Sequence, residues 1–265
     1  VNGYLILCSD DEASLNIAKH ADCNIITYGI EPLNSEILNK SGLKSVAHYS
    51  VFNVTTKTVS DCAELSNLYE YTILKNGTAL TDVCLHIPGK HNILNSLAAA
   101  AAADIAGCPS KAIAEGLENF EGAGRRFEIV GKVNGACVID DYAHHPTEIK
   151  ATLDSAHISS TGKIWSVFQP HTYSRALAFQ NEFCEVFKQS DYVISTDIYA
   201  AREPFTDKIS SLILTENFCA NGINALYIPK FQDIADYLKE NVKPDDIVLL
   251  LGAGTVNQIA KLLVD

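Results

Sequence analysis

Residues 136–149 have the sequence ACVIDDYAHHPTEI, and this stretch indicates the fold more directly than any other. Its apolar run predicts a strand buried on both faces, which ends at Asp140 and Asp141. Pro146 suits the first turn of a helix, and the Thr-Glu pair after it favours a helix start there. A buried strand that leads through polar residues into a helix is typical of an open parallel α/β sheet.

The chain after this stretch repeats the same alternation of short apolar runs and amphipathic segments. Strands are predicted at FEIVGKV, KIWSVFQP, YVISTD, ALYIP and DIVLLLG, and helices at HPTEIKATLDSAH, SRALAFQNEFCEVFKQS, FQDIADYLKENV and TVNQIAKLLV. We therefore predict a doubly wound, Rossmann-like α/β domain over residues 123–265.

Residues 1–122 form the other predicted domain, and the boundary lies in the glycine- and arginine-containing loop EGAGRRF. Strands are predicted at YLILCS and NIITYG, with a helix at DEASLNIAKH between them. Residues 43–88 favour antiparallel strands along one edge of that sheet, with KNGT as a hairpin turn. Helices are predicted at residues 91–106 and 109–119.

The composition of the chain narrows its possible functions. A formal charge of −12 argues against nucleic acid or an anionic membrane as the main partner. No apolar run approaches the roughly 20 residues that span a bilayer. The eight cysteines are scattered without a Cys-x-x-Cys pair, which favours reduced thiols in a cytosolic protein over disulfides or a zinc site.

Two polar strand ends are the strongest candidates for function, because ligands of open α/β sheets bind at the carboxyl ends of strands. One is the Asp-Asp and His-His run after ACVI. The other is FQPHTYSRA, in which His171 and Arg175 are four residues apart and can share a helix face. Convergence of the two on one ligand is favoured over two capped turns. A metal site is disfavoured, because adjacent histidines diverge and no third ligand is close in sequence.

Three further stretches carry weaker signals. PGKHNILNSLAA places two asparagines at the start of an alanine-rich helix, and the spacing alone favours an Asn N-cap over recognition of a base edge. The arginines of GAGRRF could clamp a phosphate or be solvated. LLLGAGTV has a glycine turn that would suit an anion at the next helix N-terminus, but it is a weak dinucleotide signal.

The chain resembles the Mur ligases in five stretches that occur in this order: PGKHNILNSLAA, GAGRRFE, DDYAHHPTEIKATL, FQPHTYSR and DIYAAREP. Those enzymes use ATP to add amino acids to UDP-N-acetylmuramate in peptidoglycan synthesis. DDYAHHPTEI and FQPHTYSR resemble the members that add L-alanine. The resemblance is strong over residues 88–205. It implies that residues 1–122 are the latter part of a central ATP-binding domain and that residues 123–265 are the C-terminal Rossmann-like ligase domain.

The resemblance also implies a reaction in which ATP phosphorylates the lactyl carboxylate and the amine of L-alanine then displaces phosphate. The implied site residues are His91, Asn92 and Asn95 for adenine, Arg126 and Asp141 for phosphate and ribose, and His144, His171 and Arg175 for L-alanine. Thr172 stands where a second arginine is common, so recognition of the alanine carboxylate would lean on Arg175. His145 receives no role.

ATP and Mg²⁺ are the expected cofactors, and the family's magnesium ligands would precede residue 1. ATP is expected to contact both domains, with EGAGRRF as the hinge. The chain has no Gly-x-x-Gly-Lys-Thr phosphate loop and no UDP-sugar domain, so we expect no ligase activity from it alone. The alternatives are a peptide ligase of murein recycling, a folylpolyglutamate synthase, or a non-catalytic nucleotide-binding module.

Overall fold

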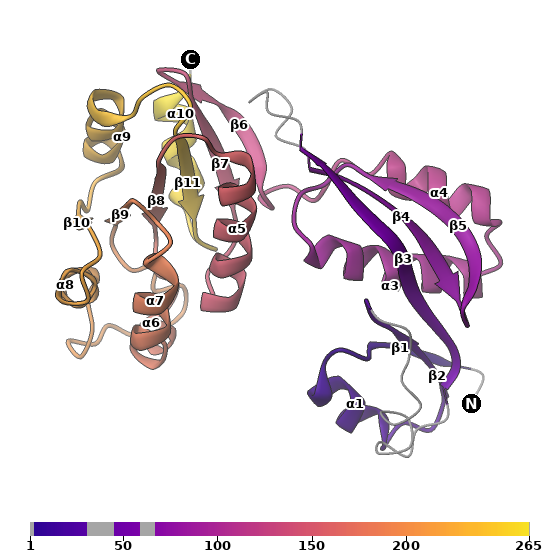
Figure 1. The fold of residues 1–265 in the computed structure, drawn as a ribbon. Coiled ribbons are helices and arrows are strands. Elements are labelled where there is room, and N and C mark those ends of the chain that lie inside the picture. Colours follow the sequence, from indigo (N-terminus) through magenta and orange to yellow (C-terminus); the bar gives the residue numbers. More distant parts are fainter. Residues whose placement is uncertain (1–2, 31–44, 59–66, 265) are drawn as a thin grey trace. The chain divides into compact units, whose positions relative to one another are not determined.

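The computed structural model describes residues 3–30, 45–58 and 67–264, and these form two compact units (Figure 1). The N-terminal unit comprises the described residues up to Glu121, and the C-terminal unit begins at Gly122. Each unit has its own sheet with helices packed on it. The mixed α/β class predicted from the sequence is confirmed.

The N-terminal unit is built on a five-stranded sheet of order β1-β2-β3-β4-β5. Its strands are β1 (Tyr4–Cys8), β2 (Asn24–Tyr28), β3 (Ser45–Thr58), β4 (Asn67–Lys75) and β5 (Thr78–Leu85). β1 to β3 run parallel and β3 to β5 antiparallel, as predicted. Asn76 and Gly77 form the predicted hairpin turn, and both have the positive φ (51° and 77°) that a type I′ turn requires.

Helices cover both faces of this sheet. The described helices are α1 (Glu12–Ala18), α3 (His91–Ile105) and α4 (Ser110–Glu118). α1 and α3 pack on the parallel strands from opposite faces, and α4 packs on β5. α3 and α4 share one buried cluster with the sheet, in which Ala100 and Ala101 are fully buried. The small alanine side chains let α3 approach the strands closely. α1 packs in a separate cluster, where Leu15 meets Leu7 and Ile25.

The C-terminal unit is built on a six-stranded sheet of order β10-β9-β8-β11-β7-β6. Its strands are β6 (Glu128–Val133), β7 (Ala136–Asp141), β8 (Ile164–Phe168), β9 (Tyr192–Ser195), β10 (Ala225–Tyr227) and β11 (Ile247–Leu251). All neighbours are parallel except β6, which pairs antiparallel with β7. The Asn134-Gly135 turn between β6 and β7 is too short for a parallel crossover.

Helices lie on both faces of the second sheet (Figure 1), which confirms the doubly wound prediction. They are α5 (Pro146–Ser159), α6 (Tyr173–Ala178), α7 (Gln180–Phe187), α8 (Ser211–Ala220), α9 (Phe231–Asn241), the 3₁₀ helix η1 (Val256–Ile259) and α10 (Ala260–Leu263). β11 shows the two-sided burial: Leu249 packs with α5, α7 and α8, and Leu250 packs with α9 and η1.

Three helices differ from the sequence prediction. The segment predicted as one helix at SRALAFQNEFCEVFKQS is divided into α6 and α7 at Phe179 (φ −114°, ψ 24°), whose ring packs against that of His145. The last helix begins as the 3₁₀ turn η1. α8 was not predicted, because Leu212 and Ile213 in its sequence SLILTENFCA are exposed and the apolar residues therefore show no helical period.

Within the described ranges, no helix is long and apolar enough to cross a membrane.

A buried carboxylate, that of Asp246, connects three segments at the amino end of β11 and β8. Asp246 is 5% exposed and accepts hydrogen bonds from the backbone N–H of Lys163 (2.8 Å) and of Lys243 (3.0 Å) and from Trp165 Nε1 (3.0 Å). The Trp165 ring stacks on Tyr192 with centroids 3.9 Å apart. Asp246 thus satisfies two backbone N–H groups and the Trp165 indole, so we assign it a role in holding the fold together.

Candidate functional site

The polar strand ends predicted to converge are neighbours in the C-terminal sheet. β11 pairs with both β7 and β8, and Leu251 is opposite Asp141 on one side and Phe168 on the other. The stretches that follow β7 and β8 therefore leave the sheet at the same edge. There the imidazole rings of His144 and His171 lie 5.4 Å apart, centroid to centroid. The structure brings these two predicted residues into one cluster.

His145, which had no predicted role, caps helix α5. Its Nδ1 accepts a hydrogen bond from the Thr147 N–H at 3.3 Å. Glu148 reaches back to the N–H groups of His144 (3.0 Å) and His145 (3.1 Å), which completes a capping box. Burial opposes ionisation of Glu148, but these donors hold its pKa below the ordinary value. The predicted helix start at Pro146 is confirmed.

The same cap fixes the orientation of His144. Its Nδ1 lies 2.9 Å from the carbonyl oxygen of Tyr142 and 3.3 Å from Glu148 Oε2. A carbonyl oxygen only accepts, so Nδ1 carries a hydrogen in this contact. The ring of Tyr142 meets that of His144 edge-on at 5.5 Å.

His171 lies between a cation and an aromatic ring. Its Nδ1 is 3.4 Å from Arg175 Nη1, so the two side chains meet. They do not share a helix face as predicted, because α6 begins only at Tyr173 and His171 lies before its cap. The Tyr199 ring stacks beside it at 5.7 Å. Burial lowers the pKa of His171, and the nearby charges of His144 and Arg175 lower it further. The arrangement therefore combines a neutral imidazole with a guanidinium that can bind a carboxylate.

Thr172 and Glu203 hold this turn in place. Thr172 has a φ of 64°, which is rare for a β-branched residue, and its N–H donates to the Tyr199 carbonyl at 2.9 Å. The carboxylate of Glu203 accepts from the Ser174 N–H at 2.9 Å and from the Ser174 hydroxyl. The stretch DIYAAREP, which contains Tyr199 and Glu203, is thus bound to the turn that carries His171.

Asp141 is engaged by donors of its own unit. Its Oδ1 accepts from the Ala143 N–H at 2.8 Å, and its Oδ2 accepts from the Phe127 N–H and the Thr152 hydroxyl, both at 3.0 Å. Burial raises the pKa of Asp141, although these donors and the charge of Arg126 oppose the rise. The carboxylate joins the loop before β6 to α5, and contact with a ribose stays a prediction.

The paired arginines of GAGRRF differ in their surroundings. The Arg125 Nε donates to the Asp140 carboxylate at 3.0 Å, and its two terminal nitrogens donate to the carbonyls of Gly252 (2.7 Å) and Gly254 (3.2 Å). Arg126 is exposed and makes no hydrogen bond or salt bridge within the described part of the chain. Arg126 is therefore available to a ligand, whereas Arg125 is not.

The glycine turn after β11 does not offer the anion site that its sequence suggested. Gln169 Oε1 accepts from the N–H groups of Thr255 (2.7 Å) and Val256 (3.0 Å), so a side-chain amide takes the donors that an anion would need. The helix that follows is also only a short 3₁₀ turn. The anion interpretation of this turn is therefore wrong.

The asparagines predicted for adenine lie in the first turns of α3, in the N-terminal unit. Neither is an N-cap, since that position is Lys90 and no side chain caps the helix, so the Asn N-cap interpretation is wrong. The Asn92 amide donates to the Pro88 carbonyl at 2.6 Å, and the Asn95 amide donates to Asn92 Oδ1 at 2.9 Å. His91 and Asn95 are exposed on the helix surface.

Both units of the chain match models of known protein families. The Mur ligase middle domain matches residues 1–103, and the Mur ligase glutamate ligase domain matches residues 125–254. The chain belongs to the Mur ligase family.

Curated Mur ligases of similar sequence agree in their names. The chain is 42% identical over 261 residues to a UDP-N-acetylmuramate–L-alanine ligase of Acetivibrio thermocellus, covering 98% of this chain and 52% of the relative. It is 42% identical over 260 residues to the protein of the same name from Clostridium acetobutylicum, with the same coverage. This Mur ligase chain thus spans about half the length of the relatives it matches.

Solved Mur ligases share the fold at lower identity. A UDP-N-acetylmuramate–alanine ligase from Thermotoga maritima superimposes with a TM-score of 0.68 at 22% identity, covering 94% of this chain and 52% of that one. A murein peptide ligase from Psychrobacter arcticus gives 0.60 at 20% identity, covering 91% and 50%. A MurF ligase from T. maritima in complex with ADP gives 0.65 at 16% identity, covering 98% and 61%.

In this Mur ligase, four residues that shape the site lie in stretches singled out from the sequence but received no individual role there: Arg125, Gln169, Tyr199 and Glu203. Tyr199 and Glu203 follow the end of β9, a third polar strand end in the same sheet, and that position was the available signal. Arg125 and Gln169 act through partners more than eighty residues away in sequence. Nothing local in the sequence distinguished Arg125 from Arg126 or gave Gln169 a role.

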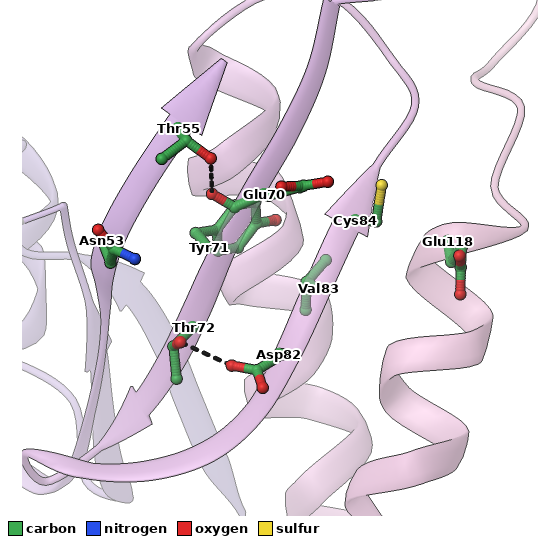
Figure 2. A pocket seen from close by; sticks show the side chains of 9 residues that line it. All are labelled: Asn53, Thr55, Glu70, Tyr71, Thr72, Asp82, Val83, Cys84 and Glu118. Carbon is green, nitrogen blue, oxygen red and sulfur yellow. Dashed lines mark hydrogen bonds between the residues drawn. The ribbon is translucent and has the colours of Figure 1, made fainter. Parts of the chain in front are cut away.

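The Mur ligase chain also has a groove in its N-terminal unit, and its lining includes none of the predicted site residues. It measures about 520 Å³ and lies over β3, β4 and β5 beside the end of α4 (Figure 2). Its carboxylates are Glu70, Asp82 and Glu118, and Asp82 accepts a hydrogen bond from Thr72 at 2.6 Å. Among the described residues, no group of three or more His, Cys, Asp or Glu is arranged to hold a metal.

Proposed function

We propose that this chain is the part of a UDP-N-acetylmuramate–L-alanine ligase that binds ATP and L-alanine. The observation that carries the proposal is the cluster of His144, His171 and Arg175 where β7 and β8 end. It occurs in a chain 42% identical to proteins of that name. In the proposed reaction, ATP phosphorylates the lactyl carboxylate, the amine of L-alanine attacks the acyl phosphate, and phosphate leaves.

The three clustered residues would bind L-alanine by complementary chemistry. Arg175 would pair with the amino-acid carboxylate, for which its planar guanidinium is suited. The attacking amine must lose a proton, and the lowered pKa of His171 keeps that ring neutral and able to accept one near pH 7. His144, whose ring is oriented by the carbonyl of Tyr142, would orient the same amine.

Each unit would contribute its own residues to ATP. In the N-terminal unit these are His91, Asn92 and Asn95, which would contact adenine. In the C-terminal unit Arg126 would hold phosphate and Asp141 ribose. Mg²⁺ would neutralise charge on the phosphoryl group. We also propose a cytoplasmic location, because all seven cysteines in the described residues are free thiols.

Amino-acid-dependent ATP turnover tests the proposal. A full-length protein that carries this chain should release phosphate from ATP and UDP-N-acetylmuramate when L-alanine is supplied, and not when a tripeptide or L-glutamate replaces it. Turnover with the tripeptide alone would favour a murein peptide ligase instead. Turnover with glutamate alone would favour the folylpolyglutamate class. Nucleotide binding without any turnover would favour a binding module.

A further inference from the structure

Two adjacent arginines face opposite environments in the loop before β6. Arg125 uses its side chain entirely within the C-terminal unit: Nε donates to Asp140, Nη2 to the Gly252 carbonyl and Nη1 to the Gly254 carbonyl. Its guanidinium also lies 4.9 Å from the centroid of the Tyr142 ring. Arg126 has none of these ties and is exposed. The first arginine is thus bound to the ends of β7 and β11, while the second is presented to solvent.

The backbone on both sides of Arg126 is held in an unfavourable conformation. Arg125 has a φ of 58° and Phe127 a φ of 49°, in the left-handed region that side chains other than glycine's rarely adopt. Such residues persist only where the surroundings fix them. Here the Arg125 N–H donates to Glu128 Oε2 (2.6 Å), and the Phe127 N–H donates to Asp141 Oδ2 (3.0 Å).

The tie between Arg125 and the sheet is electrostatic and buried. Asp140 is 4% exposed, and its Oδ1 has no hydrogen-bond partner among the described residues. Removing the guanidinium would leave a buried carboxylate without its cation, which is strongly unfavourable. A lysine would keep the charge, but it has one nitrogen and cannot reach the carboxylate and both glycine carbonyls in the planar geometry of Arg125.

We infer that Arg125 is a positioning residue, which holds the loop at residues 124–128 on the ends of β7 and β11 so that Arg126 meets the phosphate groups of ATP. The inference rests on the proposed function, because it takes Arg126 as the residue that touches the nucleotide. Arg125 also orders the amino-acid side of the site, because Tyr142 lies between its guanidinium and the ring of His144. One partly buried side chain would therefore align both substrates.

Steady-state kinetics of a full-length protein that carries this chain test the inference. Arg126→Ala should raise the KM for ATP about tenfold or more, which is the loss of one charge-assisted contact of about 1.4 kcal/mol. Arg125→Lys should raise the same KM about fivefold to tenfold without touching ATP. In the double variant Arg125→Lys/Arg126→Ala, the KM for ATP should be no higher than in Arg126→Ala. If Arg125 acts on ATP only by positioning Arg126, displacing the loop has no further effect on ATP binding once the Arg126 side chain is absent.

Controls separate positioning from loss of stability or of charge. Lys132→Ala removes an exposed cation from the adjoining strand β6 and should leave the KM unchanged. All variants are compared below their melting temperatures.

The two proposals fail in different ways. An ordinary KM for ATP in Arg126→Ala overturns the assignment of Arg126 and with it this part of the proposed function. A raised KM in Arg126→Ala, combined with an ordinary KM in Arg125→Lys or with additive effects in the double variant, overturns the positioning role of Arg125 alone.

Discussion

At the scale of single residues, His171 is the side chain whose protonation the structure controls most clearly near the proposed alanine site. Burial lowers its pKa, the charges of His144 and Arg175 act in the same direction, and Glu203 opposes them. The native state therefore binds fewer protons here than the unfolded chain. Stability contributed by this ring is present above the ordinary histidine value of 6.5 and is lost as pH falls below it.

A pH series tests this consequence for His171. His171→Asn should flatten the part of the stability profile that rises as the pH approaches 6.5 from below, because asparagine does not titrate there. The measurement is the free energy of unfolding in urea at several pH values. If the variant keeps the slope of the parent in that window, His171 does not titrate as its surroundings indicate.

Arg175 provides the sharpest kinetic prediction for the amino-acid site. Arg175→Ala in a full-length protein should raise the KM for L-alanine by about tenfold or more, since a charge-assisted bidentate pair is lost, and should raise the KM for ATP much less. Steady-state assays in which each substrate is varied in turn measure both constants. Equal increases in the two constants would contradict the pairing of Arg175 with the alanine carboxylate.

At the scale of secondary structure, helix α5 begins with a cap that stabilises the fold. His145→Ala should lower the free energy of unfolding by about 1 kcal/mol, because it removes the acceptor for the Thr147 N–H. His145→Asp should retain most of the stability, since aspartate caps well. Thr147→Ala, at an exposed position two residues further on, is the matched control because it keeps the N–H that His145 accepts. Urea unfolding of the three variants measures the effect, and equal stability of the Ala and Asp variants would rule out a cap.

Local signals in the sequence were sufficient for much of this architecture. The run ACVI and Pro146 predicted β7 and α5, and the Asn76-Gly77 pair predicted a hairpin. The break at Phe179 depends on a ring contact with His145, more than thirty residues earlier, so no local pattern marked it. Arg125 is bound within the unit and Arg126 is exposed because the carbonyl that Arg125 contacts belongs to Gly252, over a hundred residues later. Long-range contacts account for what was missed in the site.

At the scale of the whole molecule, each of the two units has its own buried clusters. We expect the isolated chain to fold, to bind ATP weakly and to show no ligase activity, because it has no phosphate loop and spans only about half of its relatives. Titration calorimetry with ATP and a phosphate-release assay measure these outcomes. Sustained turnover by the isolated chain would overturn this expectation.

The tryptophan stacked on Tyr192 also gives the molecule a spectroscopic reporter. Trp165 is the only tryptophan in the chain and is 4% exposed, bonded to Asp246 in the C-terminal unit. Its fluorescence should therefore shift to longer wavelength only when that unit unfolds, whereas circular dichroism follows both units. Non-coincident transitions would reveal that the units melt independently, and ATP could then be assigned to whichever unit it stabilises.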